Sequence, residues 1–121
     1  MKFNEMYWPD SQIEEIKIKY NELVITVFND LLRKTVNVIC KNFAGITNLC
    51  IWDDTVIFSA KLEKATNELF YNEIIKAYTN INGELDKFDK FRTLASGLLK
   101  LSLELTNGIS CEIYCQSVEV E

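Results

Sequence analysis

Four cysteines are the residues whose chemistry is most readily tested by spacing: Cys40, Cys50, Cys111 and Cys115. Structural zinc sites usually draw their ligands in pairs two to four residues apart on a tight turn. Cys111 and Cys115 have this spacing, but their segment alternates as a strand does, and four strand residues span ~13 Å. The pattern therefore favours reduced cysteines that pack as small apolar side chains over a zinc site or disulfides.

The adjacent acids Asp53 and Asp54 are the second candidate, because two carboxylates at a suitable separation can hydrolyse a glycosidic bond. Adjacent acids between two expected strands are, however, more typical of a solvated corner. The chain contains no histidine, which removes the commonest general base and every Ser-His or Cys-His pair. Its four glycines are isolated, so no phosphate-binding loop is recognisable. We therefore expect no enzymatic activity, no metal and no cofactor.

The acidity of the chain indicates what kind of partner it could bind. The net charge is −5 and the pI about 4.8, and an acidic surface repels nucleic-acid phosphates but attracts a basic protein. Two tryptophans lie beside acids, and tryptophan is enriched at binding hot spots, although it is more often buried in a core. The candidate partner-binding residues are Trp8, Asp10, Trp52, Asp53 and Asp54.

Length and composition predict one globular domain over residues 1–121. Apolar residues make up 48% of the chain and charged residues 26%, which suits a packed core. No apolar run approaches the ~20 residues that cross a bilayer. Asn4 and Glu5 interrupt the N-terminus where a secretory signal would be apolar. We expect a cytoplasmic protein that does not bind membranes.

Alternation of apolar and polar residues predicts strands through the first half of the chain. In the first strand, Ile16, Ile18 and Tyr20 share a half-buried face, and Asn21-Glu22 form the turn that follows. The expected strands span 16–20, 23–31, 35–43, 46–52 and 55–62.

The C-terminal part predicts a hairpin between strands over 99–105 and 109–115. A two-residue Asn-Gly turn would place Leu103 opposite Glu112. A three-residue loop instead pairs Leu105 with Ile109 and Leu103 with Cys111, which keeps both apolar rows on one face. We therefore expect the longer loop, with Gly108 in a left-handed conformation.

Between these parts the apolar period changes to three and four residues, which predicts an amphipathic helix over 66–79. Asn82-Gly83 would end it, and a polar connection over 84–93 would follow. The expected fold is α+β: a mainly antiparallel sheet of about six to seven strands, with one amphipathic helix packed on one face.

Several short segments resemble small acidic immunity proteins that bacteria encode beside polymorphic toxins, including those of contact-dependent growth inhibition. The segments are Trp8-Pro9-Asp10-Ser11, Val38-Ile39-Cys40-Lys41-Asn42-Phe43-Ala44-Gly45, Trp52-Asp53-Asp54 and Glu112-Ile113-Tyr114-Cys115. The resemblance implies an inhibitor that binds one cognate toxin domain, often a basic nuclease. The families share no catalytic motif.

An alternative from another class is a structural or regulatory module without enzymatic activity. Such a module would form homodimers or larger oligomers through an exposed sheet edge, for example that of the C-terminal strand.

Overall fold

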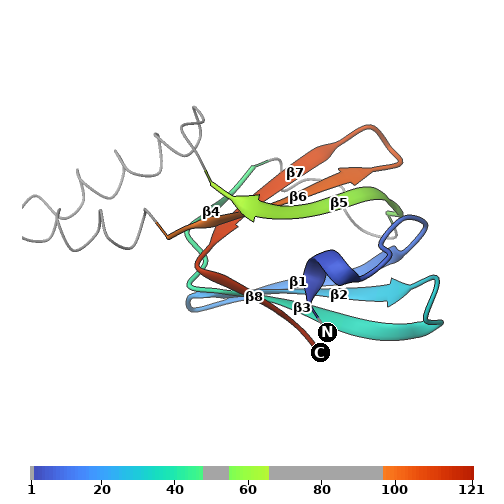
Figure 1. Ribbon diagram of the computed structural model, residues 1–121, viewed down its shortest axis with the longest axis horizontal. Coiled ribbons are helices and arrows are strands. Elements are labelled where there is room, and N and C mark those ends of the chain that lie inside the picture. The colour runs from blue at the N-terminus through green and yellow to red at the C-terminus, as the bar shows by residue number, and fades with distance from the viewer. Residues whose placement is uncertain (1, 48–54, 66–96) are drawn as a thin grey trace, which may run out of the picture.

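The computed structural model of the protein describes residues 2–47, 55–65 and 97–121. These residues form a short 3-10 helix and eight strands: η1 (Phe3–Glu5), β1 (Gln12–Lys19), β2 (Glu22–Asn29), β3 (Lys34–Lys41), β4 (Gly45–Ile46), β5 (Ile57–Lys64), β6 (Leu99–Leu105), β7 (Ser110–Cys115) and β8 (Ser117–Val120). The strands make two antiparallel sheets in two layers, one ordered β1-β2-β3-β8 and the other β4-β7-β6-β5 (Figure 1).

The expected α+β fold is wrong, because the described residues form a sandwich of two four-stranded sheets in place of one sheet covered by a helix. Among these residues the longest helical element is η1, which has three residues. The helix expected over 66–79 and the connection over 84–93 lie outside the described residues. Alternation shows that a strand has one apolar face, but it does not show what covers that face. Here the apolar faces of the two sheets cover each other.

The core lies between the sheets and is built from alternate residues of their central strands. Each fully buried aliphatic side chain contributes ~1.5–3 kcal/mol to folding. Phe3 and Trp8 join this core from the N-terminal segment, with their rings stacked at a centroid distance of 4.6 Å. The buried cluster comprises Phe3, Trp8, Ile13, Leu23, Ile25, Val27, Val36, Val38, Cys40, Ile57, Leu101, Leu103, Leu105, Cys111, Ile113 and Cys115.

Two segments that pair with each other cross from one sheet to the other at one edge of the sandwich, where β8 and β4 are the outermost strands. β3 continues through residues 42–44 into β4, and β7 continues through Gln116 into β8. Across this corner, Ala44 N donates to Tyr114 O (2.7 Å) and Gln116 N donates to Lys41 O (2.9 Å). Asn42 has a positive φ of 52°, which lets the chain turn here.

The opposite edge is closed by hydrogen bonds between the start of β1 and the start of β5. Ile13 N donates to Thr55 O (2.9 Å), and Ile57 N donates to Ser11 O (2.7 Å). The two sheets are therefore joined by backbone hydrogen bonds at both edges, which ties the sandwich into one unit.

The predicted C-terminal hairpin is confirmed in register and in loop length. Leu103 pairs with Cys111, and Leu105 N donates to Ile109 O at 2.9 Å. Gly108 has φ 87°, the left-handed conformation that glycine adopts at least cost.

The first hairpin differs from its prediction. Lys19 pairs with Glu22, so the turn consists of Tyr20 and Asn21. Tyr20 is 93% exposed because it lies in the turn, and Ile18 is 48% exposed although its cross-strand partner Leu23 is fully buried. At the other end of β1, the register shifts between Ile13 and Glu15. A bulge of this kind alters which residues of the strand face the core.

The other predicted strands exist with shifted ends. The ranges 23–31, 35–43 and 55–62 correspond to β2, β3 and β5. Of the range 46–52, only residue 46 lies in a described strand, and residues 48–52 lie outside the described parts.

Candidate functional site

The structure separates the two predicted site residues of the N-terminal segment. Trp8 is only 3% exposed, and its Nε1 donates to Phe3 O at 2.8 Å. Asp10 is exposed and has a left-handed backbone with φ 67°, and its N–H donates to Ile57 O. A partner can reach Asp10 directly, whereas it would reach the Trp8 ring only if the surrounding segment moved. Trp52, Asp53 and Asp54 lie outside the described residues, so their roles stay predictions.

Three exposed apolar side chains near the turn between β2 and β3 were missed by the sequence analysis. Tyr7 is 52% exposed, Leu31 65% and Leu32 39%. We call these three residues the apolar patch. The available signal was the turn dipeptide Asn29-Asp30, because apolar residues directly after such a turn leave the strand and reach solvent.

The buried side chain of Asn29 holds the backbone on both sides of the apolar patch. It is 1% exposed; its Nδ2 donates to Tyr7 O and its Oδ1 accepts from Leu32 N, both at 2.9 Å. One amide thus links the N-terminal segment to the β2–β3 turn. A surface fixed in this way loses less conformational entropy when a partner binds.

Two acidic residues lie close to the apolar patch along the chain. Asp10 lies three residues after Tyr7, and Asp30 directly precedes Leu31. The backbone N–H of Asp30 donates to Ser11 Oγ (3.1 Å), which joins the two acidic positions. Arg33 Nη1 contacts Asp30 Oδ1 at 3.1 Å, an exposed pair worth at most ~1 kcal/mol. Exposed apolar side chains with a polar border are typical of a protein-binding surface.

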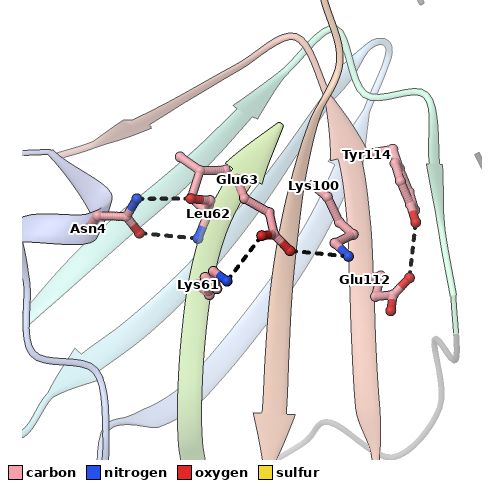
Figure 2. Close-up of polar contacts among 7 residues, drawn as sticks. All are labelled: Asn4, Lys61, Leu62, Glu63, Lys100, Glu112 and Tyr114. Atoms are coloured by element: carbon pink, nitrogen blue, oxygen red, sulfur yellow. Dashed lines mark hydrogen bonds and ion pairs between the residues drawn. The ribbon is translucent and has the colours of Figure 1, made fainter. Parts of the chain in front are cut away.

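A second polar cluster lies on the face of the β4-β7-β6-β5 sheet that points away from the core (Figure 2). Cross-strand pairing places Glu63 beside Lys100, and Lys100 beside Tyr114. Glu63 accepts ion pairs from Lys61 Nζ (3.1 Å) and Lys100 Nζ (3.2 Å). Next to this row, Tyr114 OH donates to Glu112 Oε2 at 3.0 Å.

The charges in this second cluster satisfy one another. Hydrogen bonds from Lys61, and then from Lys100, hold the pKa of Glu63 below its usual range. Glu63 is therefore ionised at neutral pH and cannot act as a general acid there. Lys100, engaged by that carboxylate, is an ion-paired ammonium and not a free nucleophile. The arrangement supports a structural role on this face of the sheet, where Lys100 and Tyr114 are buried.

We expect Glu63→Gln to destabilise the protein at neutral pH, because the buried Lys100 loses its ion pair with the Glu63 carboxylate. Because the pKa of Glu63 is lower in the folded than in the unfolded protein, its ion pairs stabilise the fold fully at pH values above the unfolded-state pKa. This stabilisation is lost as the pH falls through the folded-state pKa. The stability difference between wild type and variant should thus shrink below pH 4.5, the ordinary pKa of the group. Urea unfolding at pH 7 and pH 3 measures this. A difference independent of pH would contradict it.

The described cysteines are core residues. Cys40, Cys111 and Cys115 are buried free thiols, and Cys50 lies outside the described residues. A hydrogen bond with Cys115 and burial raise the pKa of Cys40 well above its usual range, so its thiol stays neutral. In residues 2–47, 55–65 and 97–121, no group of three or more His, Cys, Asp or Glu side chains is placed to hold a metal ion.

The described residues form a small void inside the core and an open groove at the surface. The internal one has a volume of about 10 Å³ and is lined by apolar side chains that include Phe3 and Trp8. A dry void of this size holds no ligand. A surface groove of about 460 Å³ lies between η1 and β8, lined by Lys2, Glu5 and residues 118–121.

The chain was also compared with known proteins. No protein-family model matches it, and neither the curated proteins nor the solved structures gave a match. Within the described residues, none of the helical structure has the length and apolar character needed to span a membrane.

Proposed function

We propose that the protein is a cytoplasmic immunity protein that binds one cognate bacterial toxin domain and neutralises it by covering its active site. The observation that carries this proposal is the exposed apolar patch, Tyr7, Leu31 and Leu32, fixed by Asn29. The resemblance of several sequence segments to immunity proteins supports it independently.

The charges around the apolar patch indicate the chemistry of the toxin. Asp10 and Asp30 lie close to the patch along the chain, and the whole chain carries a net charge of −5. Such a surface steers a basic partner toward it and speeds their encounter. A toxin domain with a cationic active-site groove, such as a nuclease, fits this field. An interface of ~1,600 Å² centred on the patch would be large enough to cover such a groove.

The direct test is co-expression with the product of a neighbouring toxin-like gene. We expect the two proteins to co-purify and the chain to protect cells from the toxin's growth inhibition. Failure of both would reject the proposal, whereas binding without protection would reject occlusion of the active site.

Within that complex, we expect Leu31→Lys to weaken toxin binding by about 100-fold, equivalent to ~2.7 kcal/mol. The change removes an exposed apolar contact and places a cation against a basic partner. The matched control is Ile18→Lys, which makes the same charge change at an exposed residue of the first hairpin. Calorimetric titration measures both affinities. Equal affinities for the two variants would exclude the apolar patch as the interface.

The alternative, a homo-oligomer formed through the C-terminal strand, also has a supporting observation. Among the residues the structure describes, β3 is the only strand that pairs with β8. Light scattering across a dilution series distinguishes the two proposals, because a module that acts by self-assembly stays oligomeric without a toxin.

A further inference from the structure

The edge of β8 that faces away from β3 offers backbone hydrogen-bonding groups. Asn37 and Glu121 exchange two hydrogen bonds, Asn37 N to Glu121 O (2.8 Å) and Glu121 N to Asn37 O (2.9 Å). In an antiparallel ladder such exchanges recur at every second residue. The N–H and C=O groups of Val118 and Val120 therefore point away from β3. An edge of this kind is a template for an added strand.

The helix η1 lies close to β8, and the residues at its start and end form one wall of the groove while β8 forms the other. The groove has a volume of about 460 Å³ and is lined by Lys2, Glu5, Val118, Glu119, Val120 and Glu121. Asn4 anchors η1 to β5, because its Nδ2 donates to Leu62 O (2.9 Å) and its Oδ1 accepts from Leu62 N (3.1 Å) (Figure 2). Both walls are thus attached to the sandwich, and the groove exists before any partner binds.

The lining of the groove is acidic. It holds three carboxylates, on Glu5, Glu119 and Glu121, and one ammonium, on Lys2, so its formal charge is −2. Lys41 Nζ contacts Glu119 Oε1 at 3.2 Å, but both side chains are almost half exposed, so this pair is weak. Cationic side chains therefore complement the groove.

We propose that the groove between η1 and β8 binds an extended lysine- or arginine-rich segment of another protein, which adds to β8 as a further strand. The backbone of that segment pairs with Val118 and Val120, and its cations face the carboxylates of the groove. This site is distinct from the apolar patch, and binding here does not depend on toxin neutralisation.

A second copy of the chain fits this edge less well. Antiparallel pairing of two β8 strands with full overlap, Val118 opposite Val120 of the second copy, places the Glu119 side chains of both copies opposite each other. Like charges directly opposite in a sheet are destabilising. A basic segment replaces this repulsion by attraction.

The test uses the full chain and two fluorescently labelled ten-residue peptides, one alternating lysine with valine and one alternating glutamate with valine. Fluorescence anisotropy should detect binding of the lysine peptide only. Raising the salt concentration from 50 mM to 500 mM should weaken it, because the attraction is screened. Equal binding of the two peptides, or no binding of the lysine peptide up to 1 mM, would overturn the proposal.

Two variants at one position test the added strand itself. Val120→Pro removes an N–H that points away from β3, a placement at which an edge strand tolerates proline. We expect about tenfold weaker peptide binding for Val120→Pro and unchanged binding for Val120→Ala, which keeps the N–H. Equal binding by both variants would exclude backbone pairing at this edge.

A charge-reversed variant, Glu119→Lys/Glu121→Lys, provides a readout that does not depend on proline being tolerated. Both side chains are exposed, so the fold should be retained. We expect this variant to prefer the glutamate peptide to the lysine peptide. An unchanged preference would place peptide binding elsewhere on the surface and overturn the proposal.

Discussion

Replacing Trp8 by alanine is expected to lower the free energy of unfolding by about 3–5 kcal/mol. The indole is 3% exposed and stacks on Phe3, and its N–H donates to Phe3 O. Both residues line the internal void of about 10 Å³, so the deleted ring would enlarge a space that is already unfilled. Loosening of the N-terminal segment adds to this cost, because the ring is one of the side chains that join this segment to the core.

Urea unfolding followed by circular dichroism measures this effect without relying on tryptophan emission. Trp8→Phe is the matched control, because it keeps an aromatic ring against Phe3 and removes only the N–H donor and part of the volume. We expect a clearly smaller loss for it, about 1–2 kcal/mol. A loss below ~1 kcal/mol for Trp8→Ala would show that the N-terminal segment does not stabilise the core.

The C-terminal hairpin was predicted in detail because two local signals agree there. Apolar residues at alternate positions from Leu99 to Cys115 allow one register that keeps both rows on one face, and Gly108 supplies the required left-handed residue. The pairing is between neighbours in sequence, so no distant part of the chain had to be known. The prediction succeeded here because the two local signals agree; at the first hairpin, where no glycine fixed the turn, the predicted turn was displaced by one residue.

The fold class failed because it depends on contacts between distant parts of the chain. β7 and β8 are separated only by Gln116, yet they belong to different sheets. The alternation that predicts β7 gives no sign that the chain crosses to the other layer there. The crossing is set by pairing with the segment from Lys41 to Ala44, about 70 residues earlier in the chain.

The candidate site was predicted only in part for a related reason. Trp8 and Asp10 are neighbours in sequence, but whether each is buried depends on Phe3 and on the start of β5. Composition predicted an acidic surface, and Asp10 is indeed exposed, whereas its role in binding stays a prediction. The exposed apolar patch depends on Asn29, whose buried amide could not be distinguished in sequence from an ordinary turn residue.

Replacing Asn29 by alanine is expected to lower the free energy of unfolding by about 2–4 kcal/mol. The change removes hydrogen bonds to Tyr7 O and Leu32 N, and each backbone group left without a partner near the core costs ~1–3 kcal/mol. It should also weaken toxin binding, because the patch backbone is no longer held. Circular dichroism at increasing urea concentration measures the first effect, and calorimetric titration the second.

Asn29→Asp distinguishes the hydrogen bonds from simple loss of volume, because the two side chains have nearly the same shape. The introduced carboxylate can still accept from Leu32 N, but it faces Tyr7 O without a donor. Burial and this carbonyl should raise the folded-state pKa of the introduced carboxyl above its unfolded value of ~3.9. The loss of stability is then complete at pH values above the folded-state pKa of this carboxyl and absent below its unfolded-state pKa. The variant should therefore approach wild-type stability as the pH falls from 7 to 3. A defect that stays constant over this range would show that the amide does not donate to Tyr7.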